Sequence, residues 1–221
     1  MTRILILGGT REAAALATEL VDKGHEVTTS LAGRTKEPRP VSGTVRVGGF
    51  GGVDGLVRYL GKNGIEKLVD ATHPFARQIS ANAAQAAELT GIEFEAITRP
   101  PWQKQDGDKW IEVATLEEAC DRIPPGARVL LALGSQHIDL FKRRDNVFFL
   151  VRMVDPPLNP PALPHHALVF GKPSPDWQEE LNMLKENAIS MIVCRNSGGP
   201  GAYAKIEAAR SLGLPVLMVQ R

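Results

Sequence analysis

A glycine-rich turn close to the amino terminus carries the strongest chemical signal in the sequence. The apolar run 4–7 leads directly into Gly8 and Gly9, and a helix-like segment follows. In the pattern G-x-G-x-x-G, the glycines allow a tight turn, backbone contact with a pyrophosphate and close helix packing. Gly8, Thr10 and Ala13 occupy those places. We expect helix N–H groups, together with the Thr10 hydroxyl, to bind phosphate here. The alternative is a plain strand-to-helix turn.

The end of the second predicted strand indicates which dinucleotide would bind. Sites for NAD place an acidic side chain on the ribose hydroxyls, about twenty residues past the glycines. The segment 28–34 contains no acid and offers Ser30 and Arg34 instead. A hydroxyl and a guanidinium suit a 2′-phosphate, which favours NADPH over NADH. Alternatively, Arg34 is a solvated loop charge.

Two further turns follow predicted strands of the first half. Gly48, Gly49 and Phe50 end one strand, and the segment 70–76 ends the next. Because ligands of open α/β sheets bind at the carboxyl ends of the strands, both turns are candidate cofactor contacts. In the second turn we expect Thr72 to cap a helix that Pro74 opens.

A second glycine-rich turn lies in the other half of the chain. Residues 195–201 connect an apolar strand to a helix, with Arg195 and Lys205 nearby. A helix amino end with two cations suits carboxylates or phosphates. The alternative is a flexible connection with two exposed cations. Tyr203 and Lys205 are too close in sequence for the Tyr-x-x-x-Lys pair of short-chain dehydrogenases.

Alternating apolar runs and amphipathic segments predict an α/β fold with parallel sheets. In the first half we expect strands at 3–7, 25–31, 44–47, 67–71 and 93–98 and helices at 11–22, 53–62 and 76–89. In the second half we expect strands at 110–114, 128–133, 147–153, 167–170, 189–194 and 215–219 and helices at 115–122, 135–143, 176–187 and 201–212. The proline-marked stretch 100–108 predicts a linker between domains 1–99 and 109–221.

Composition excludes several classes of function. A net charge of +1 gives no field for nucleic acid or an anionic membrane surface. No apolar run is long enough to span a membrane, so we expect a cytoplasmic protein. Cys120 and Cys194 fit no disulfide or zinc spacing, and the adjacent His165 and His166 lack a carboxylate companion. We therefore expect no metal, and we leave the oligomeric state open, with a monomer among the alternatives.

Three motifs in the same order resemble precorrin-6A reductases. They are Gly8-Gly9-Thr10 with Glu12-Ala13, Asp70-Ala71-Thr72-His73-Pro74-Phe75-Ala76, and Asn196-Ser197-Gly198-Gly199 with residues 202–205. The resemblance spans nearly the whole chain, and the second motif is the most specific. It implies two Rossmann-like lobes with a cleft between them, NADPH bound chiefly by the first lobe, and reduction of a macrocycle double bond in precorrin-6A to give precorrin-6B in cobalamin biosynthesis.

The motifs and the resemblance together give a candidate site. The expected cofactor contacts are Gly8, Gly9, Thr10, Arg11, Glu12, Ser30, Arg34, Gly48, Gly49, Phe50, Ala71, Thr72, His73 and Pro74. The expected contacts to the tetrapyrrole substrate are Arg77, Arg99, Arg195, Asn196, Ser197, Gly198, Gly199 and Lys205. Lys205, Tyr203, His73 or water would supply a proton, with none indispensable. The alternatives are an NADPH sensor without catalysis and a two-lobed nucleotide-sugar transferase.

Overall fold

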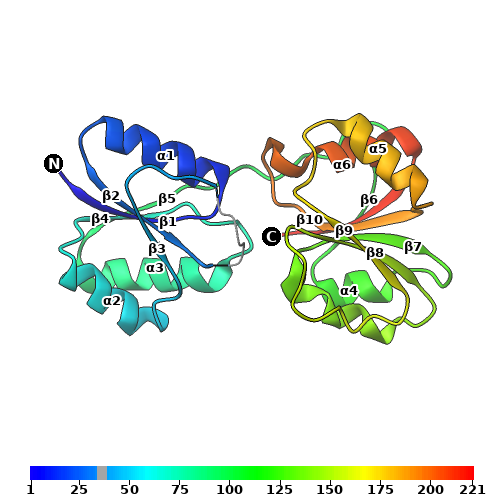
Figure 1. Ribbon diagram of the computed structural model, residues 1–221, viewed down its shortest axis with the longest axis horizontal. Helices are drawn as coiled ribbons and strands as arrows, with labels where there is room; N and C mark the ends of the chain where they lie inside the picture. Colours follow the sequence, from blue (N-terminus) through cyan, green and yellow to red (C-terminus); the bar gives the residue numbers. More distant parts are fainter. Residues whose placement is uncertain (34–38) are drawn as a thin grey trace. The chain divides into compact units, whose positions relative to one another are not determined.

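Parallel strands and helices make up the protein, as a computed structural model of residues 1–33 and 39–221 describes it (Figure 1). The chain divides into two compact units, Met1–Arg99 and Pro100–Arg221. All strand pairs within the two sheets are parallel. The predicted α/β class with parallel sheets is therefore confirmed. Arg34 lies outside the described residues.

Unit 1 is a five-stranded sheet in the order β3-β2-β1-β4-β5. Its elements are β1 (Arg3–Leu7), α1 (Arg11–Asp22), β2 (Glu26–Leu31), β3 (Thr44–Val47), α2 (Gly52–Lys62), β4 (Lys67–Asp70), α3 (Arg77–Thr90) and β5 (Glu93–Ala96). Helix α1 covers one face of the sheet, and α2 and α3 cover the other (Figure 1).

The central strand of unit 1 is apolar on both faces because helices cover both. Ile4 and Ile6 pack in the cluster beneath α1, whereas Leu5 and Leu7 pack in the cluster beneath α2 and α3. Helix α1 contributes small residues, Ala13 and Ala17, to its contact with the sheet. This close packing brings the start of α1 down onto the end of β1.

Unit 2 is a six-stranded sheet in the order β6-β11-β10-β7-β8-β9. Its elements are β6 (Lys109–Val113), α4 (Leu116–Asp121), β7 (Arg128–Ala132), η1 (Ser135–His137), η2 (Asp139–Arg143), β8 (Phe148–Met153), β9 (His166–Phe170), α5 (Trp177–Glu186), β10 (Met191–Arg195), η3 (Pro200–Ala202), α6 (Ala204–Leu212) and β11 (Pro215–Val219). Helices α5 and α6 cover one face, and α4 lies on the other (Figure 1).

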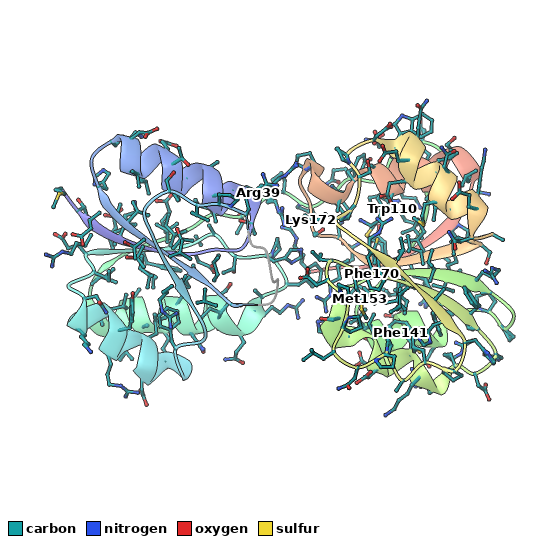
Figure 2. The ribbon with its side chains drawn as sticks, in the orientation of Figure 1. Arg39, Trp110, Phe141, Met153, Phe170 and Lys172 are labelled. Atoms are coloured by element: carbon teal, nitrogen blue, oxygen red, sulfur yellow. The ribbon has the colours of Figure 1, made fainter. Side chains whose placement is uncertain are left out.

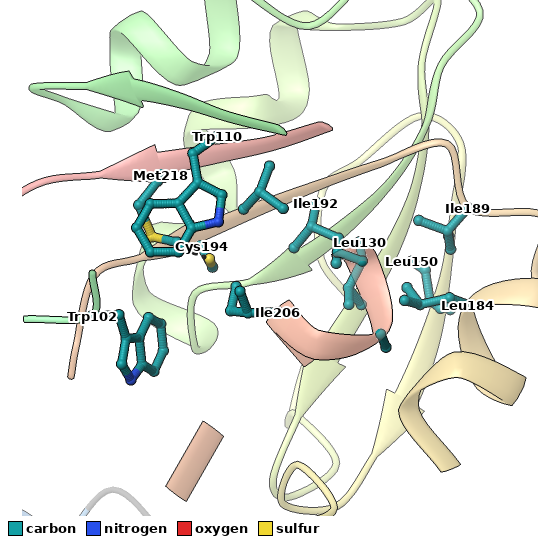
Figure 3. Close-up of a cluster of buried hydrophobic side chains, with 13 residues drawn as sticks. Trp102, Trp110, Leu130, Leu150, Leu184, Ile189, Ile192, Cys194, Ile206 and Met218 are labelled. Carbon is teal, nitrogen blue, oxygen red and sulfur yellow. Dashed lines mark hydrogen bonds between the residues drawn. The ribbon is translucent and has the colours of Figure 1, made fainter. Parts of the chain in front are cut away.

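The core of unit 2 is rich in aromatic and sulfur side chains. On the face beneath α5 and α6, Trp110 and Met218 lie close to Cys194 (Figure 3), whose Sγ is 3.7 Å from the Met218 Sδ. On the opposite face lies Phe141 of η2 (Figure 2), which meets Phe149 edge to face at 5.7 Å between ring centroids. These rings bury a large apolar area, which anchors the strands that carry the second glycine-rich turn.

Three parts of the chain differ from what the sequence predicts. The segment 135–143 forms two short 3-10 helices instead of one α-helix. Helix α3 begins at Arg77, and its N-cap Ala76 makes no side-chain cap, so neither Thr72 nor Pro74 starts it. Residues 100–108 belong to unit 2, where Trp102 is only 8% exposed.

Each sheet has one place where the direction of winding reverses. In unit 1 the chain moves outward from β1 to β3 on one side and from β4 to β5 on the other. In unit 2 the corresponding neighbours are β7 and β10. Loops at such a switch point diverge to opposite faces of the sheet and leave a crevice at its carboxyl edge, where ligands of open α/β folds bind. The two glycine-rich turns follow β1 and β10, and therefore lie at the two switch points.

The Asn196 side chain holds the Trp102 backbone against the second glycine-rich turn by hydrogen bonds. Its side-chain Oδ1 accepts from the Trp102 backbone N–H at 2.7 Å, and its Nδ2 donates to the Trp102 carbonyl at 3.1 Å. The Trp102 indole Nε1 donates to the Gly199 carbonyl at 2.7 Å. Asn196 is 2% exposed, so these are buried hydrogen bonds.

We predict that Asn196→Ala lowers the free energy of unfolding by about 2–4 kcal/mol, because it leaves two buried backbone groups of Trp102 without partners. Urea unfolding followed by tryptophan fluorescence measures this change. Asn82→Ala, which removes a side-chain contact to Gln78 on the surface of α3, is the matched control. Equal losses in the two variants would contradict the assignment.

Candidate functional site

A hydrogen bond joins the two loops at the switch point of unit 1. The Thr10 hydroxyl donates to the Ala71 carbonyl at 2.7 Å and accepts from the Ala13 N–H at 3.1 Å. Thr10 is therefore the N-cap of α1, and its hydroxyl also links the loop after β1 to the loop after β4. Its one O–H donor is used within unit 1 in this structure, and the neighbouring backbone N–H groups remain for a phosphate.

The two glycines of the first turn have different roles. A Cβ on Gly8 would lie 2.7 Å from Thr29 Cγ2, so the end of β1 leaves no room for a side chain. The Gly8 N–H donates to the Ser30 carbonyl at 2.9 Å. Gly9 has a φ of 105°, which favours glycine, and no atom lies within 4 Å of its Cβ position. Gly9 thus presents open backbone that a ligand can approach.

The first turn of α1 supplies donors to the same place. The N–H groups of Arg11 and Glu12 precede any intrahelical acceptor, as at every helix start. Glu12 accepts from Arg99 Nη1 at 3.3 Å, and this ion pair is partly buried. Arg99 was predicted to contact the substrate, but the structure places it beside the helix start, where it offsets the charge of Glu12.

Ser30 has a cationic partner that the sequence did not reveal. Arg46 Nη1 donates to the Ser30 Oγ at 2.7 Å and to the Gly48 carbonyl at 2.9 Å, and Nη2 donates to the Gly49 carbonyl at 3.0 Å. The guanidinium lies 3.9 Å from the centroid of the Phe50 ring. Arg46 therefore connects four predicted cofactor residues. Only the register of β3 against β2, which pairs Arg46 with Ser30, brings them together.

The most specific of the three motifs forms a compact loop after β4. Asp70 Oδ1 accepts from the Thr72 N–H at 3.0 Å and from its hydroxyl at 2.7 Å. His73 is exposed and its Nδ1 accepts from the Phe75 N–H. Asp70 is 7% exposed and stabilises the loop through these two hydrogen bonds. Pro74 follows in the same loop, and Arg77 is exposed at the start of α3.

The second turn is held tightly by its neighbours in unit 2. The Arg221 guanidinium donates to the Asn196 and Ser197 carbonyls at 3.1 and 2.8 Å. A Cβ on Gly198 would lie 2.2 Å from the Pro100 carbonyl oxygen. The Asn196 amide is occupied by Trp102, so its part in the site is to hold this turn in shape. Arg195 is half-buried at the end of β10.

Tyr203 and Lys205 share Trp102 as a neighbour but have different surroundings. The Tyr203 ring lies 5.6 Å from that of Trp102, and its hydroxyl accepts from Arg210 Nη2 at 2.7 Å. Lys205 is 3% exposed, and its ammonium lies 4.8 Å from the indole centroid and donates to the Ala202 carbonyl. The structure thus buries Lys205 inside unit 2, which does not support the predicted contact with substrate.

Burial also changes the acid–base behaviour of this region. Desolvation lowers the pKa of Lys205 and raises the pKa of the neighbouring Cys194 thiol. Both shifts disfavour charge in the interior of unit 2.

Among residues 1–33 and 39–221, no three His, Cys, Asp or Glu side chains are grouped so that they could bind a metal.

The geometry defines a class of protein first. Two doubly wound parallel units, each with a glycine-rich turn at its switch point, form a Rossmann-like α/β protein. Residues 3–221 match the family model described as precorrin-6x reductase CbiJ/CobK. The chain belongs to this family and is therefore an oxidoreductase of the corrin pathway.

Known relatives agree with the family model. A precorrin-6A reductase of Rhodobacter capsulatus is 46% identical over 100% of this chain and 88% of its own length. One from Rhodococcus erythropolis is 44% identical, over 100% of this chain and 90% of its own length. A solved structure titled CobK precorrin-6A reductase superposes with a TM-score of 0.95 at 46% identity, covering 100% of this chain and 88% of that one. The sensor and sugar-transferase alternatives are set aside, because the family is one of reductases.

In the described part of the chain, no helix has the length and apolar character to cross a bilayer.

We predict that Thr10→Val lowers the free energy of unfolding by about 1–2 kcal/mol, through loss of the helix cap and of the bond to Ala71. Chemical denaturation monitored by circular dichroism measures the loss. Thr10→Ser keeps the hydroxyl and should restore most of it. Thr18→Val, on the exposed side of α1, is the control. A Thr10→Val variant as stable as this control would contradict the stabilising role of the Thr10 hydroxyl.

We predict that Lys205→Met flattens the rise of stability with pH. Because the folded-state pKa of Lys205 lies below the ordinary value of 10.5, the unfolded chain binds more protons between the two values, and stability increases with pH across that window. Urea unfolding of wild type and variant between about pH 7 and about pH 10 gives the difference, in which the Cys194 contribution largely cancels. Lys185→Met, an exposed site on α5, should keep the wild-type slope. An unchanged slope in Lys205→Met would refute the assignment.

Proposed function

We propose that this chain reduces precorrin-6A with NADPH as the reductant, and that unit 1 holds the dinucleotide. The observation that carries the proposal is the first turn, where open backbone at Gly9 adjoins the start of α1 at the switch point. A pyrophosphate there would accept from the N–H groups of Arg11 and Glu12 and gain from the helix dipole. The hydrogen bond from Thr10 to Ala71 holds this phosphate-binding cradle, the turn at Gly9 and the start of α1, in place without a contact from the hydroxyl to phosphate.

The remaining predicted cofactor contacts surround this cradle within unit 1. Gly48, Gly49 and Phe50 follow β3, while Ala71, Thr72, His73 and Pro74 follow β4. These strands end on either side of β1 and β2 at the carboxyl edge of the sheet. Ser30 and Arg46 supply a hydroxyl and a cation, and residues 28–33 at the end of β2 include no acidic side chain to hold the ribose of NADH.

The chemistry divides between cofactor and protein. NADPH, when bound, supplies a hydride to an electrophilic carbon of the macrocycle. The protein binds the reactants and orients them. In unit 2, Arg195 and the backbone of 197–199 are the proposed contacts for the carboxylate arms of the substrate, and Arg77 in unit 1 is a further exposed cation.

Tyr203 is better placed than Lys205 to supply a proton to the substrate. Its hydroxyl oxygen accepts a hydrogen bond from Arg210, which leaves the O–H proton available for donation. Lys205 is buried against Trp102. His73 is exposed in unit 1, and water can serve as well, so we propose that no single acid is indispensable.

Binding and turnover test the proposed function together. We expect the purified protein to bind NADPH more tightly than NADH in a fluorescence titration, and to oxidise NADPH when precorrin-6A is added. Metal-free precorrin-6A should be preferred to cobalt-precorrin-6A, because relatives named for the former are 42–46% identical and one named for the latter is 27% identical. Tyr203→Phe should retain part of the turnover.

Three results of the same experiments would contradict parts of the proposed function. Binding of neither nucleotide would refute the cofactor site in unit 1. Binding of NADPH with no oxidation on either macrocycle would refute the substrate. A Tyr203→Phe variant that binds both ligands but loses nearly all turnover would show that this hydroxyl is indispensable.

A further inference from the structure

Arg46 is a half-buried cation, and the described residues that hold it are neutral. Its hydrogen bonds go to one hydroxyl and two backbone carbonyls, and among the described residues it forms no ion pair. Its flat face lies 3.9 Å from the centroid of Phe50, and Tyr59 lies 5.1 Å away. These contacts hold the guanidinium in place, and within residues 1–33 and 39–221 no carboxylate pairs with its positive charge.

The bond to Ser30 determines what the Ser30 hydroxyl can do. A serine hydroxyl has one proton to donate. Because Arg46 donates to Ser30 Oγ at 2.7 Å, the oxygen acts as acceptor on that side and its own proton is directed elsewhere. No other residue of the described chain takes that proton. A charge-assisted bond of this kind also polarises the O–H, so the hydroxyl becomes a better donor to an anion.

The pair lies next to the proposed cofactor cradle. The Ser30 carbonyl accepts from the Gly8 N–H at 2.9 Å, so Ser30 is the immediate neighbour of the first turn. Ser30 is 7% exposed and is the penultimate residue of β2, the strand whose end holds the adenosine ribose in dinucleotide folds. The loop that Arg46 shapes through Gly48 and Gly49 follows the next strand of the sheet.

We propose that Arg46 and Ser30 form one anion-selecting unit that makes unit 1 prefer a ribose carrying a 2′-phosphate. Arg46 supplies the positive charge and orients Ser30, and the Ser30 O–H donates to a phosphate oxygen. This inference rests on the proposed use of NADPH and deepens it. Arg46 is a specificity and positioning residue; it takes no part in hydride or proton transfer.

The test is a double-mutant cycle read with paired probes. Arg46→Met, Ser30→Ala and the double variant are titrated with NADPH and NADH, and with the fragments 2′,5′-ADP and 5′-AMP. We expect Arg46→Met to weaken NADPH and 2′,5′-ADP by about tenfold or more, as the loss of a charge-assisted contact does. NADH and 5′-AMP should change little. The double variant should bind NADPH no worse than Arg46→Met, because the Ser30 O–H is directed at the phosphate only while Arg46 orients it.

Two controls separate selection from loss of structure. Arg46→Lys keeps the charge but not the flat, forked group, so it should lose part of the preference while remaining folded. Arg58→Lys, at an exposed position on α2, should match wild type. In turnover, KM for NADPH should rise in the Arg46 variants, whereas kcat and KM for precorrin-6A stay unchanged.

The outcomes distinguish this inference from the proposed function. Equal loss of NADPH and NADH affinity, or additive effects of the two substitutions, would overturn the anion-selecting unit and make Arg46 a purely structural residue. If the wild-type protein bound neither nucleotide, the proposed function itself would fail before any variant was compared. If Arg46→Met does not fold, the ratio of NADPH to NADH affinity in Arg46→Lys decides the matter.

Discussion

The close packing at Gly8 is the constraint on which the first site depends. A Cβ there would overlap Thr29, so β1, β2 and the start of α1 meet only because this position has no side chain. This packing allows Thr10 both to cap α1 and to reach the Ala71 carbonyl. β1 and β4 are paired in the sheet as far as Leu7 and Asp70, and the bond from Thr10 to Ala71 extends this contact into the two loops that follow.

Unit 2 shapes its own switch-point turn by a different device. A bulky residue, Trp102, lies against the second turn, and Asn196 holds the Trp102 backbone through both of its amide atoms. Gly198 is required because the Pro100 carbonyl occupies the space of a side chain. Both turns thus need a glycine, against the Thr29 side chain in unit 1 and against the Pro100 backbone in unit 2. In the first turn the next glycine, Gly9, is open, whereas in the second turn the Trp102 indole donates to the Gly199 carbonyl.

The elements could be predicted from the sequence because periodicity and glycine caps are local properties. Strands β1, β3 and β11 and helix α1 have the predicted limits. The 135–143 segment was predicted wrongly as one α-helix, since its apolar spacing does not distinguish a 3-10 helix from an α-helix. The bond from Thr10 to Ala71 could not be predicted for a similar reason: a hydroxyl beside a helix start can serve the helix, a ligand or another loop, and the sequence does not show that Ala71 lies within reach.

Arg46 shows what sequence reasoning cannot reach. Its neighbours in the chain are apolar or small and carry no chemical signal. Its importance comes from the register of β3 on β2, a pairing that one residue of slip would destroy. The predicted residues Ser30, Gly48, Gly49 and Phe50 were recognised separately, each from its own turn. The residue that connects them could be found only in three dimensions.

The charges around both turns share a feature that bears on ligand binding. Arg46 is fixed by carbonyls and a hydroxyl, Arg99 by Glu12, and Arg210 by Asp108 and Tyr203. A cation already held in place loses little side-chain entropy when an anion arrives. With a net charge of only +1, the protein has no general attraction for anions to rely on. Its selectivity must therefore come from such local, pre-organised groups, and Arg46 differs from the other two because neutral acceptors leave its charge available.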